Sequence, residues 1–174
     1  MLDPANLSIS EALRDGRKVE IRSQRPSDRE ALESALARMS DESIYRRFFS
    51  AKRNFSEKEA EHFLDIDFVS HVALVAVIDE DGEQAIVGAG RYIVAQPGKA
   101  EVAFGVVDQY QGQGLGSALM GALIAIARQA GMNELIAEVL DSNRAMLKVF
   151  EKSRLQMTTK KREGPVIHAT LKFA

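Results

Sequence analysis

The sequence contains no cysteine among its 174 residues. This absence excludes a disulfide framework, a thiolate metal site and a cysteine nucleophile, and it fits a reducing compartment such as the cytoplasm. No stretch approaches the roughly 18 uncharged apolar residues that a membrane-spanning helix needs. The N-terminus carries acidic residues where a signal peptide has an apolar core. We therefore expect a cytoplasmic protein that does not partner a membrane.

An excess of one charge is absent as well. Lys and Arg together number 23, Asp and Glu together number 25, and the formal net charge is -2. The short basic groups at 46–47, 52–53 and 160–162 lie near acidic residues, so we read them as solvated surface, although they could touch phosphates of a ligand. No nucleic-acid partner is expected from this balance.

Internal repeats and low-complexity linkers are also missing. A chain of this length can bury one substantial core and leaves little for a second. We expect residues 1–174 to form one domain, with residues 1–17 as a loosely ordered extension.

Hydrophobic periodicity indicates a sheet covered by helices. An apolar run of strand length ends at the turn signal 79–82, and two further strands follow it, which predicts an antiparallel meander. In chain order the sequence predicts a strand, three helices, three strands, a helix, a strand, a helix and two strands, over 19–22, 28–39, 42–49, 56–63, 72–78, 85–94, 100–107, 115–130, 135–140, 143–152, 155–157 and 166–173. This order is typical of an α/β (α+β) fold with a mixed, mostly antiparallel sheet.

The stretch 111–117, QGQGLGS, lies between a predicted strand and the long helix. Its glycines allow positive φ and let a ligand approach without meeting a Cβ. Outward amides at a helix N-terminus suit an anion such as a pyrophosphate. A P-loop is excluded because the required lysine is missing, and the dinucleotide fingerprint fails in its glycine spacing. A glycine-rich turn without a ligand is the weaker alternative, and the loop alone specifies only an anion.

Gln111, Gly114 and Gly116 match the Q/R-x-x-G-x-G/A acyl-CoA loop of the GNAT superfamily of N-acetyltransferases. The order of elements resembles that fold from Val19 to the C-terminus. The strings AEVAFGVVDQYQGQGLGSALM and AEVLDSNRAML resemble the catalytic domain of bacterial protein lysine acetyltransferases. The segment 43–49 resembles that group too, and we expect it to pack a short helix over the acceptor side.

The resemblance implies a GNAT-like sheet with a central splay, acetyl-CoA as cosubstrate and no metal. We expect the amine to attack the thioester directly, without an acyl-enzyme, because the sequence has no cysteine and no order of residues that supports a Ser-His-Asp triad. The residues expected to hold acetyl-CoA are Gly105, Val106, Val107, Gln111, Gly112, Gln113, Gly114, Leu115, Gly116, Ser117, Asn143 and Phe150.

Strand alternation over 100–107 places Glu101, Ala103 and Gly105 on one face, so a carboxylate stands beside two very small residues. The amide of Gly105 could polarise a thioester carbonyl. Glu101 lies roughly 13 Å along the strand from Gly105, so as a base it would act through ordered water. The resemblance implies the same role. A solvent-facing glutamate without a catalytic role is nearly as good a reading of the sequence alone.

Two positions near the C-terminus complete the predicted site. Asn143 matches the family asparagine that hydrogen-bonds the pantetheine arm, and it could instead be a simple helix N-cap. Phe150 stands where many members have a tyrosine that protonates the departing thiolate. Phenylalanine cannot donate that proton, but a thiol of pKa about 8.5 can leave without help.

We therefore expect an N-acetyltransferase whose preferred acceptor is a protein lysine. A small amine is the alternative acceptor. A non-catalytic acyl-CoA-binding sensor is the alternative of another class, which Phe150 favours and Glu101 opposes. A homodimer is left open.

Overall fold

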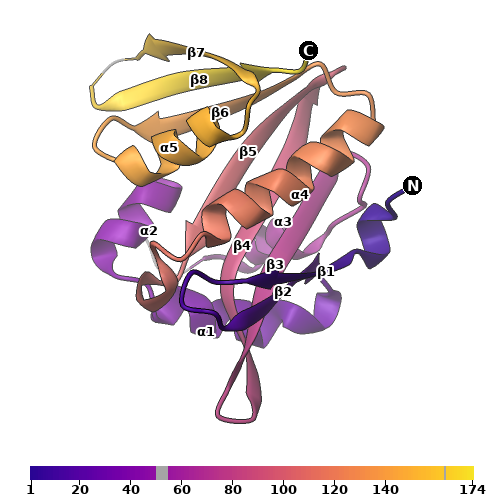
Figure 1. Ribbon diagram of the computed structural model, residues 1–174, viewed down its shortest axis with the longest axis vertical. Helices are drawn as coiled ribbons and strands as arrows, with labels where there is room; N and C mark the ends of the chain where they lie inside the picture. Colours follow the sequence, from indigo (N-terminus) through magenta and orange to yellow (C-terminus); the bar gives the residue numbers. More distant parts are fainter. Residues whose placement is uncertain (50–54, 163) are drawn as a thin grey trace.

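The computed structural model describes residues 1–49, 55–162 and 164–174. Within them runs an eight-stranded sheet in the order β1-β2-β3-β4-β5-β6-β8-β7 (Figure 1). Every neighbouring pair is antiparallel except β5 and β6, which are parallel. The strands are β1 (Ser8–Ala12), β2 (Lys18–Ser23), β3 (His71–Glu80), β4 (Glu83–Gln96), β5 (Lys99–Val106), β6 (Glu134–Leu140), β7 (Gln156–Lys161) and β8 (Val166–Lys172). The predicted mixed, mostly antiparallel sheet and its meander of β3, β4 and β5 are confirmed.

Helices cover both faces of this sheet. In Figure 1, α4 and α5 cross in front of the strands, and α1, α2 and α3 lie on the other side. The helices are η1 (Pro4–Asn6), η2 (Pro26–Asp28), α1 (Arg29–Ala37), α2 (Asp41–Phe48), α3 (Glu57–Leu64), η3 (Asp108–Tyr110), α4 (Leu115–Gln129) and α5 (Arg144–Lys152). Ser56 followed by Glu59 in the sequence predicts a capping box. This capping box opens α3, since the Ser56 hydroxyl accepts from the Glu59 amide and the Glu59 carboxylate accepts from the Ser56 amide. None of the helices in the described residues is long and apolar enough to cross a membrane.

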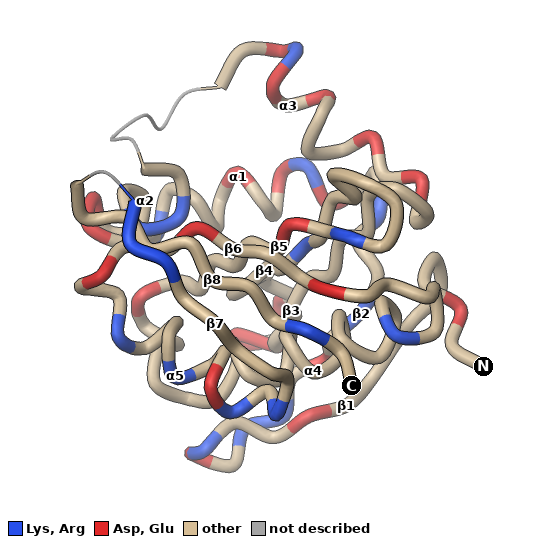
Figure 2. The backbone as a smooth tube through the Cα atoms, turned by 90° about the horizontal axis from the view of Figure 1, so that it is seen from above, with Lys and Arg blue, Asp and Glu red and all other residues tan. Residues whose placement is uncertain are grey.

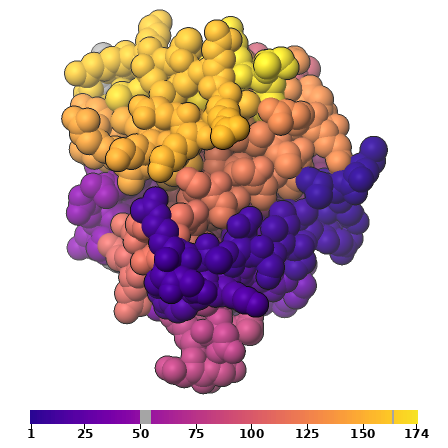
Figure 3. All heavy atoms as spheres, in the orientation of Figure 1, coloured from indigo at the N-terminus to yellow at the C-terminus, as the bar shows by residue number. Residues whose placement is uncertain are grey.

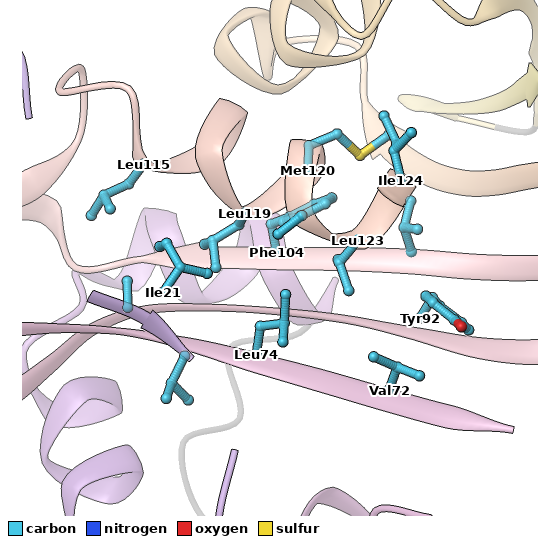
Figure 4. Close-up of a cluster of buried hydrophobic side chains, with 14 of the residues drawn as sticks. Ile21, Val72, Leu74, Tyr92, Phe104, Leu115, Leu119, Met120, Leu123 and Ile124 are labelled. Atoms are coloured by element: carbon cyan, nitrogen blue, oxygen red, sulfur yellow. The ribbon is translucent and has the colours of Figure 1, made fainter. Parts of the chain in front are cut away.

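The core lies between the sheet and α4 (Figure 4). The helical spacing of Leu115, Leu119, Leu123 and Ile126 in the sequence predicts one apolar stripe. This stripe is buried, with Leu119 and Leu123 fully inaccessible. Small residues on β4 make room for this layer, because a Cβ at Gly90 would lie only 2.8 Å from the Phe104 ring of β5 and 3.4 Å from the Leu123 side chain of α4. This close layer fixes β5 relative to the N-terminus of α4, where the predicted anion loop begins.

The strands β5 and β6 separate partway along their length. Their parallel pairing covers only Lys99 to Glu101 on β5, opposite Glu134 to Ile136 on β6. Beyond that point β5 continues along β4 to Val106, and β6 continues along β8 to Leu140. The predicted central splay is therefore present, and it leaves the backbone of β5 after Glu101 open on one side.

The N-terminal segment differs from the prediction of a loose extension. Residues 8–12 form β1, which pairs with β2 in register from Ser8–Arg22 to Ala12–Lys18. Leu7 and Leu13 are buried at the two ends of β1. The short strand gives too weak a periodic signal to be seen in the sequence, and its partner strand and these two buried leucines stabilise it in the fold.

A buried ion pair anchors the start of α1. The guanidinium of Arg22 donates to both carboxylate oxygens of Asp28 at 2.9 and 2.8 Å, and the Arg25 amide donates to Asp28 at 2.7 Å. Burial raises the pKa of Asp28, but the hydrogen bonds from Arg22 and the Arg25 amide outweigh it and hold the pKa below its usual value. The pair thus contributes stability that is complete above the unfolded pKa of about 3.9 and is lost as the pH falls through the lower folded pKa.

We expect Asp28→Asn to lower the free energy of unfolding by about 3 kcal/mol at pH 7, because it leaves the Arg22 cation buried without its partner. The difference in unfolding free energy from the unmodified protein should shrink toward pH 3, because Asp28 of the unfolded chain, with a pKa of about 3.9, takes up a proton before the folded carboxylate does. Urea denaturation at the two pH values measures this. Asp15→Asn, which breaks the exposed pair with Arg17, should change little at either pH. If the difference in unfolding free energy between Asp28→Asn and the unmodified protein stays constant with pH, Asp28 is not the ionised partner of Arg22.

Candidate active site

A cavity of about 510 Å³ opens where β5 and β6 separate. Its walls come from β5, β6, the loop before α4, and the helices α2 and α5. Most of the residues predicted to form the site line it together, namely Glu101, Gly105, Val106, Gln111, Gly112, Gly114, Leu115, Gly116, Ser117, Asn143 and Phe150. The splay thus brings the glycine loop, the strand face of Glu101 and the start of α5 to one place.

Two predicted residues do not line this cavity. Val107 is buried, its amide donates to the Val87 carbonyl at 2.9 Å, and it lines a neighbouring cavity instead. Gln113 faces the turn after β1, where its main-chain carbonyl accepts from the Arg14 amide and its side chain accepts from the Asp15 amide. The N-terminal segment lies against the loop in Figure 3. The sequence could not reveal that packing, because about a hundred residues separate the two segments.

The loop glycines have two distinct roles. Gly112 and Gly114 have φ of +77° and +93°, and a Cβ on either would meet nothing within 4 Å. Gly114 is also the N-cap of α4. Their small size is therefore required by the backbone conformation, and the space beside them is free for an anion at the helix N-terminus. Gly116 instead faces α5, since a Cβ there would lie 3.3 Å from Val149 Cγ2.

Gln111 braces the loop with its side chain. Its amide nitrogen donates to the Val106 carbonyl at 3.0 Å and to the Ser43 hydroxyl at 3.0 Å. Just before it in the chain, the Tyr110 hydroxyl bonds to the Glu80 carboxylate. The motif glutamine thus connects the end of β5, the loop and α2, and holds the loop amides in place.

Glu101 stands where the two strands part. It is the last residue of β5 to pair with β6, and its exposed side chain lines the cavity. Arg47 of α2 lines the same cavity. Burial lowers the pKa of Arg47 to about 10, and the Glu101 carboxylate opposes that shift. The strand spacing between Glu101 and Gly105 is about 13 Å, a separation too long for direct proton transfer between groups at the two positions.

Asn143 and Phe150 lie on the opposite wall, on α5. The Asn143 side chain accepts from the Met146 amide at 3.3 Å, so it is the N-cap of this helix, as the plainer interpretation held. Phe150 is only 1% exposed and lines the cavity from the buried side of α5. The position therefore offers an apolar ring where a tyrosine would offer a hydroxyl.

Basic side chains at the rim of the cavity were not predicted as site residues. The Arg14 guanidinium donates to the Gly112 carbonyl at 3.1 Å, and Arg46 pairs with Glu42 on α2. Lys148 and Lys152 come from α5, where Figure 2 shows basic residues. The sequence signal for Arg46 was the basic pair at 46–47. Nothing local distinguished Arg14, Lys148 or Lys152 from ordinary surface cations.

Comparisons with known proteins agree with this geometry. The profile of the acetyltransferase (GNAT) family matches residues 40–154. The chain is 37% identical over 137 residues to Acetyltransferase PA5475 of Pseudomonas aeruginosa, a match that covers 78% of this chain and 74% of that protein. It is 34% identical over 142 residues to Acetyltransferase Pat of Mycolicibacterium smegmatis, covering 80% of this chain and 42% of Pat, so it spans less than half of that relative.

Among solved structures, the crystal structure of the GNAT domain of S. lividans PAT matches with a TM-score of 0.83 and 34% identity. That match covers 95% of this chain and 97% of the other. Sequence and architecture thus agree over the segment that builds the splay, the loop and α5. The chain belongs to the GNAT family of acetyltransferases and is an acyltransferase of the N-acetyltransferase kind.

Proposed function

We propose that this protein transfers an acetyl group from acetyl-CoA to the side-chain amine of a protein lysine. The observation that carries the proposal is the cavity in the splay, which joins the glycine loop to Gly105 and Glu101. It provides one continuous site for a phosphate-bearing donor and for the bond that is exchanged. Acceptance of a lysine is supported by the resemblance of the strings around the loop and α5 to bacterial protein lysine acetyltransferases.

The residues present fit acetyl-CoA. The phosphates are anions, and they suit the loop at the N-terminus of α4, where Gly112 and Gly114 leave open space beside the amides. Positive charge at the rim of the cavity comes from Arg14, Lys148 and Lys152, although the chain as a whole has no excess of positive charge. The open side of β5 offers unpaired backbone to the pantetheine amides, which can pair as an additional strand would.

The chemistry follows from the two groups on the small-residue face of β5. A lysine amine is mostly protonated near neutral pH, since its ordinary pKa is about 10.4. Glu101 accepts the proton through water, and the neutral nitrogen attacks the thioester carbon. The Gly105 amide stabilises the oxyanion that develops. The carbon–nitrogen bond forms, and the nitrogen then gives up its second proton to solvent. The carbon–sulfur bond breaks, and the sulfur leaves as a thiolate that takes a proton from solvent.

The acceptor is tested by incubating the purified protein with isotope-labelled acetyl-CoA and a cell lysate, and then locating the label by mass spectrometry. We expect label on protein lysines above the background from spontaneous acetylation. The Gly114→Asp protein is the control for that background. If the label is found only on small amines, the acceptor is a small amine and not a protein lysine. If the protein binds acetyl-CoA tightly but transfers the acetyl group to no amine, it is a non-catalytic acyl-CoA-binding sensor.

The absence of a hydroxyl at Phe150 leads to a second expectation. Phe150→Tyr should fold normally, because the ring keeps its size and its hydroxyl can point toward the cavity that Phe150 lines. Turnover should stay the same or rise, since a phenol would then be available to protonate the thiolate. Steady-state kinetics with one lysine peptide, alongside calorimetric acetyl-CoA affinity, measures this. A large loss of turnover with unchanged affinity would show that the apolar ring shapes the site.

A further inference from the structure

A second cavity, of about 540 Å³, lies on the face of the sheet opposite α4. Its walls come from β4, β5 and the helices α1, α2 and α3, and they are mostly apolar, including Leu32, Leu36, Phe48, Phe55 and Phe63. The rings of Phe48, Phe55 and Phe63 pack against one another with centroids 5.2 to 6.2 Å apart. This cavity is separate from the glycine loop.

The two cavities meet at Gly105. Arg47 and Gly105 belong to the lining of both, together with Met39, Phe48 and Ala103. A molecule in the second cavity can therefore reach the place where transfer is proposed, from the side away from the donor. This continuity identifies the second cavity as the acceptor side, which the sequence predicted only as the region beneath the segment 43–49.

Arg91 of β4 is buried in the wall of this cavity, with 7% of its surface exposed. It is in register with Ala103, so it stands on the same sheet face as Gly105. Its guanidinium bonds to the Phe63 carbonyl at 3.3 Å, His71 Nε2 at 2.9 Å and Gln24 Oε1 at 3.3 Å, and it stacks over the Phe63 ring at 4.8 Å.

All of these partners are neutral at physiological pH. Burial, together with the charge of Arg91, lowers the pKa of His71 to about 4, so the imidazole accepts a hydrogen bond and carries no charge. Burial and the charge of Arg47 lower the pKa of Arg91 to about 9, which still leaves Arg91 a cation near pH 7. Within the described residues, no carboxylate forms an ion pair with Arg91.

The other charged groups of this cavity do not supply the missing anion. Arg47 is a second cation. The acid Glu33 is mostly exposed and pairs with Arg29 on its own helix at 3.2 Å. A buried cation without a counter-charge is costly, and the cost falls when a ligand brings an anion to it. The cavity thus combines apolar walls with an unneutralised guanidinium.

We infer that the second cavity binds the acceptor and that Arg91 binds a carboxylate which the acceptor carries beside its reactive amine. The inference rests on the proposed function, because it takes Gly105 as the point of transfer. The carboxylate has two sources of the same chemistry: an acidic side chain next to a target lysine, or the acid group of a small amine. Arg91 is a specificity-determining residue in either case.

The test compares acceptors that differ only in this charge. One pair is a lysine peptide with glutamate neighbours and the same peptide with glutamine neighbours, and the other is 6-aminohexanoate and 6-aminohexanamide. The charged member of at least one pair should have a kcat/KM about 10- to 100-fold higher, the range of a charge-assisted hydrogen bond. Arg91→Gln should remove that preference, and Arg128→Gln, which changes an exposed arginine on α4, should keep it. The pair that responds identifies the source.

A binding measurement separates the two proposals. Hexanoate should bind the wild-type protein more tightly than hexanamide in calorimetry, and Arg91→Gln should abolish the difference. If hexanoate shows this preference but no amine is acetylated, the proposed function fails and the anion site stands. Equal kcat/KM within both acceptor pairs of the wild-type protein, or equal binding of hexanoate and hexanamide, would overturn the inference. The wild-type comparisons decide the matter even if thermal denaturation shows that Arg91→Gln does not fold.

Discussion

Glu101→Gln is expected to reduce turnover near neutral pH by roughly 10² to 10⁴, the range for removal of a general base. The change keeps the shape of the Glu101 side chain, which is exposed and lines the splay cavity. Glu101 is the last residue of β5 that pairs with β6. The acetyl-CoA affinity should stay within a few-fold, because Glu101 stands away from the glycine loop. Higher pH should recover part of the rate, since more of the amine is then already neutral.

A pH–rate profile of kcat/KM on one acceptor measures this effect. Glu138→Gln is the matched comparison, because Glu138 is on β6 and is the second carboxylate among the residues that line the same cavity. Glu138→Gln should lose much less activity than Glu101→Gln. If Glu138→Gln loses the activity and Glu101→Gln does not, Glu138 is the base. If both profiles match that of the wild-type protein, the proton passes to solvent without a protein base.

Gly114→Asp is expected to weaken acetyl-CoA binding by about 100-fold or more. Gly114 caps α4 at φ +93°, and a side chain there would enter the open space beside the loop amides. Asp is one of the few side chains that tolerate the left-handed conformation, so the fold should survive. The added carboxylate, however, would repel the phosphates at the positive end of the helix.

Isothermal calorimetry with acetyl-CoA measures the affinity, and circular dichroism checks the fold. Gly121→Asp is the control, because Gly121 is exposed on the same helix and a Cβ there meets nothing within 4 Å. It should bind acetyl-CoA normally. Equal affinities of the two variants would place the phosphates away from this loop.

The local patterns of the sequence determined most of the fold. The apolar run at 72–78 and the two strands after it predicted the meander, because strand periodicity and the turn at 79–82 depend only on residues that are neighbours in the chain. The same holds for the buried stripe of α4 and for the capping box at Ser56. The glycine loop was visible for the same reason, since its spacing is local and its position between a strand and a helix is part of the pattern.

Only the tertiary structure decided how distant segments complete the site. β1 forms because β2 offers it a partner, and Arg14 reaches the loop across 98 residues of chain. Gly114 is needed for its positive φ, whereas Gly116 is needed because a Cβ there would contact α5, and this second role depends on where α5 packs. No pattern in the sequence distinguishes Arg91 from an ordinary strand cation. It is the unneutralised charge of a cavity because the fold brings together its surroundings, Gln24, Phe63 and His71, which are all neutral. Burial and charge pairing depend on contacts between residues far apart in the chain. A periodic pattern in the sequence depends on near neighbours only, so it cannot predict those contacts.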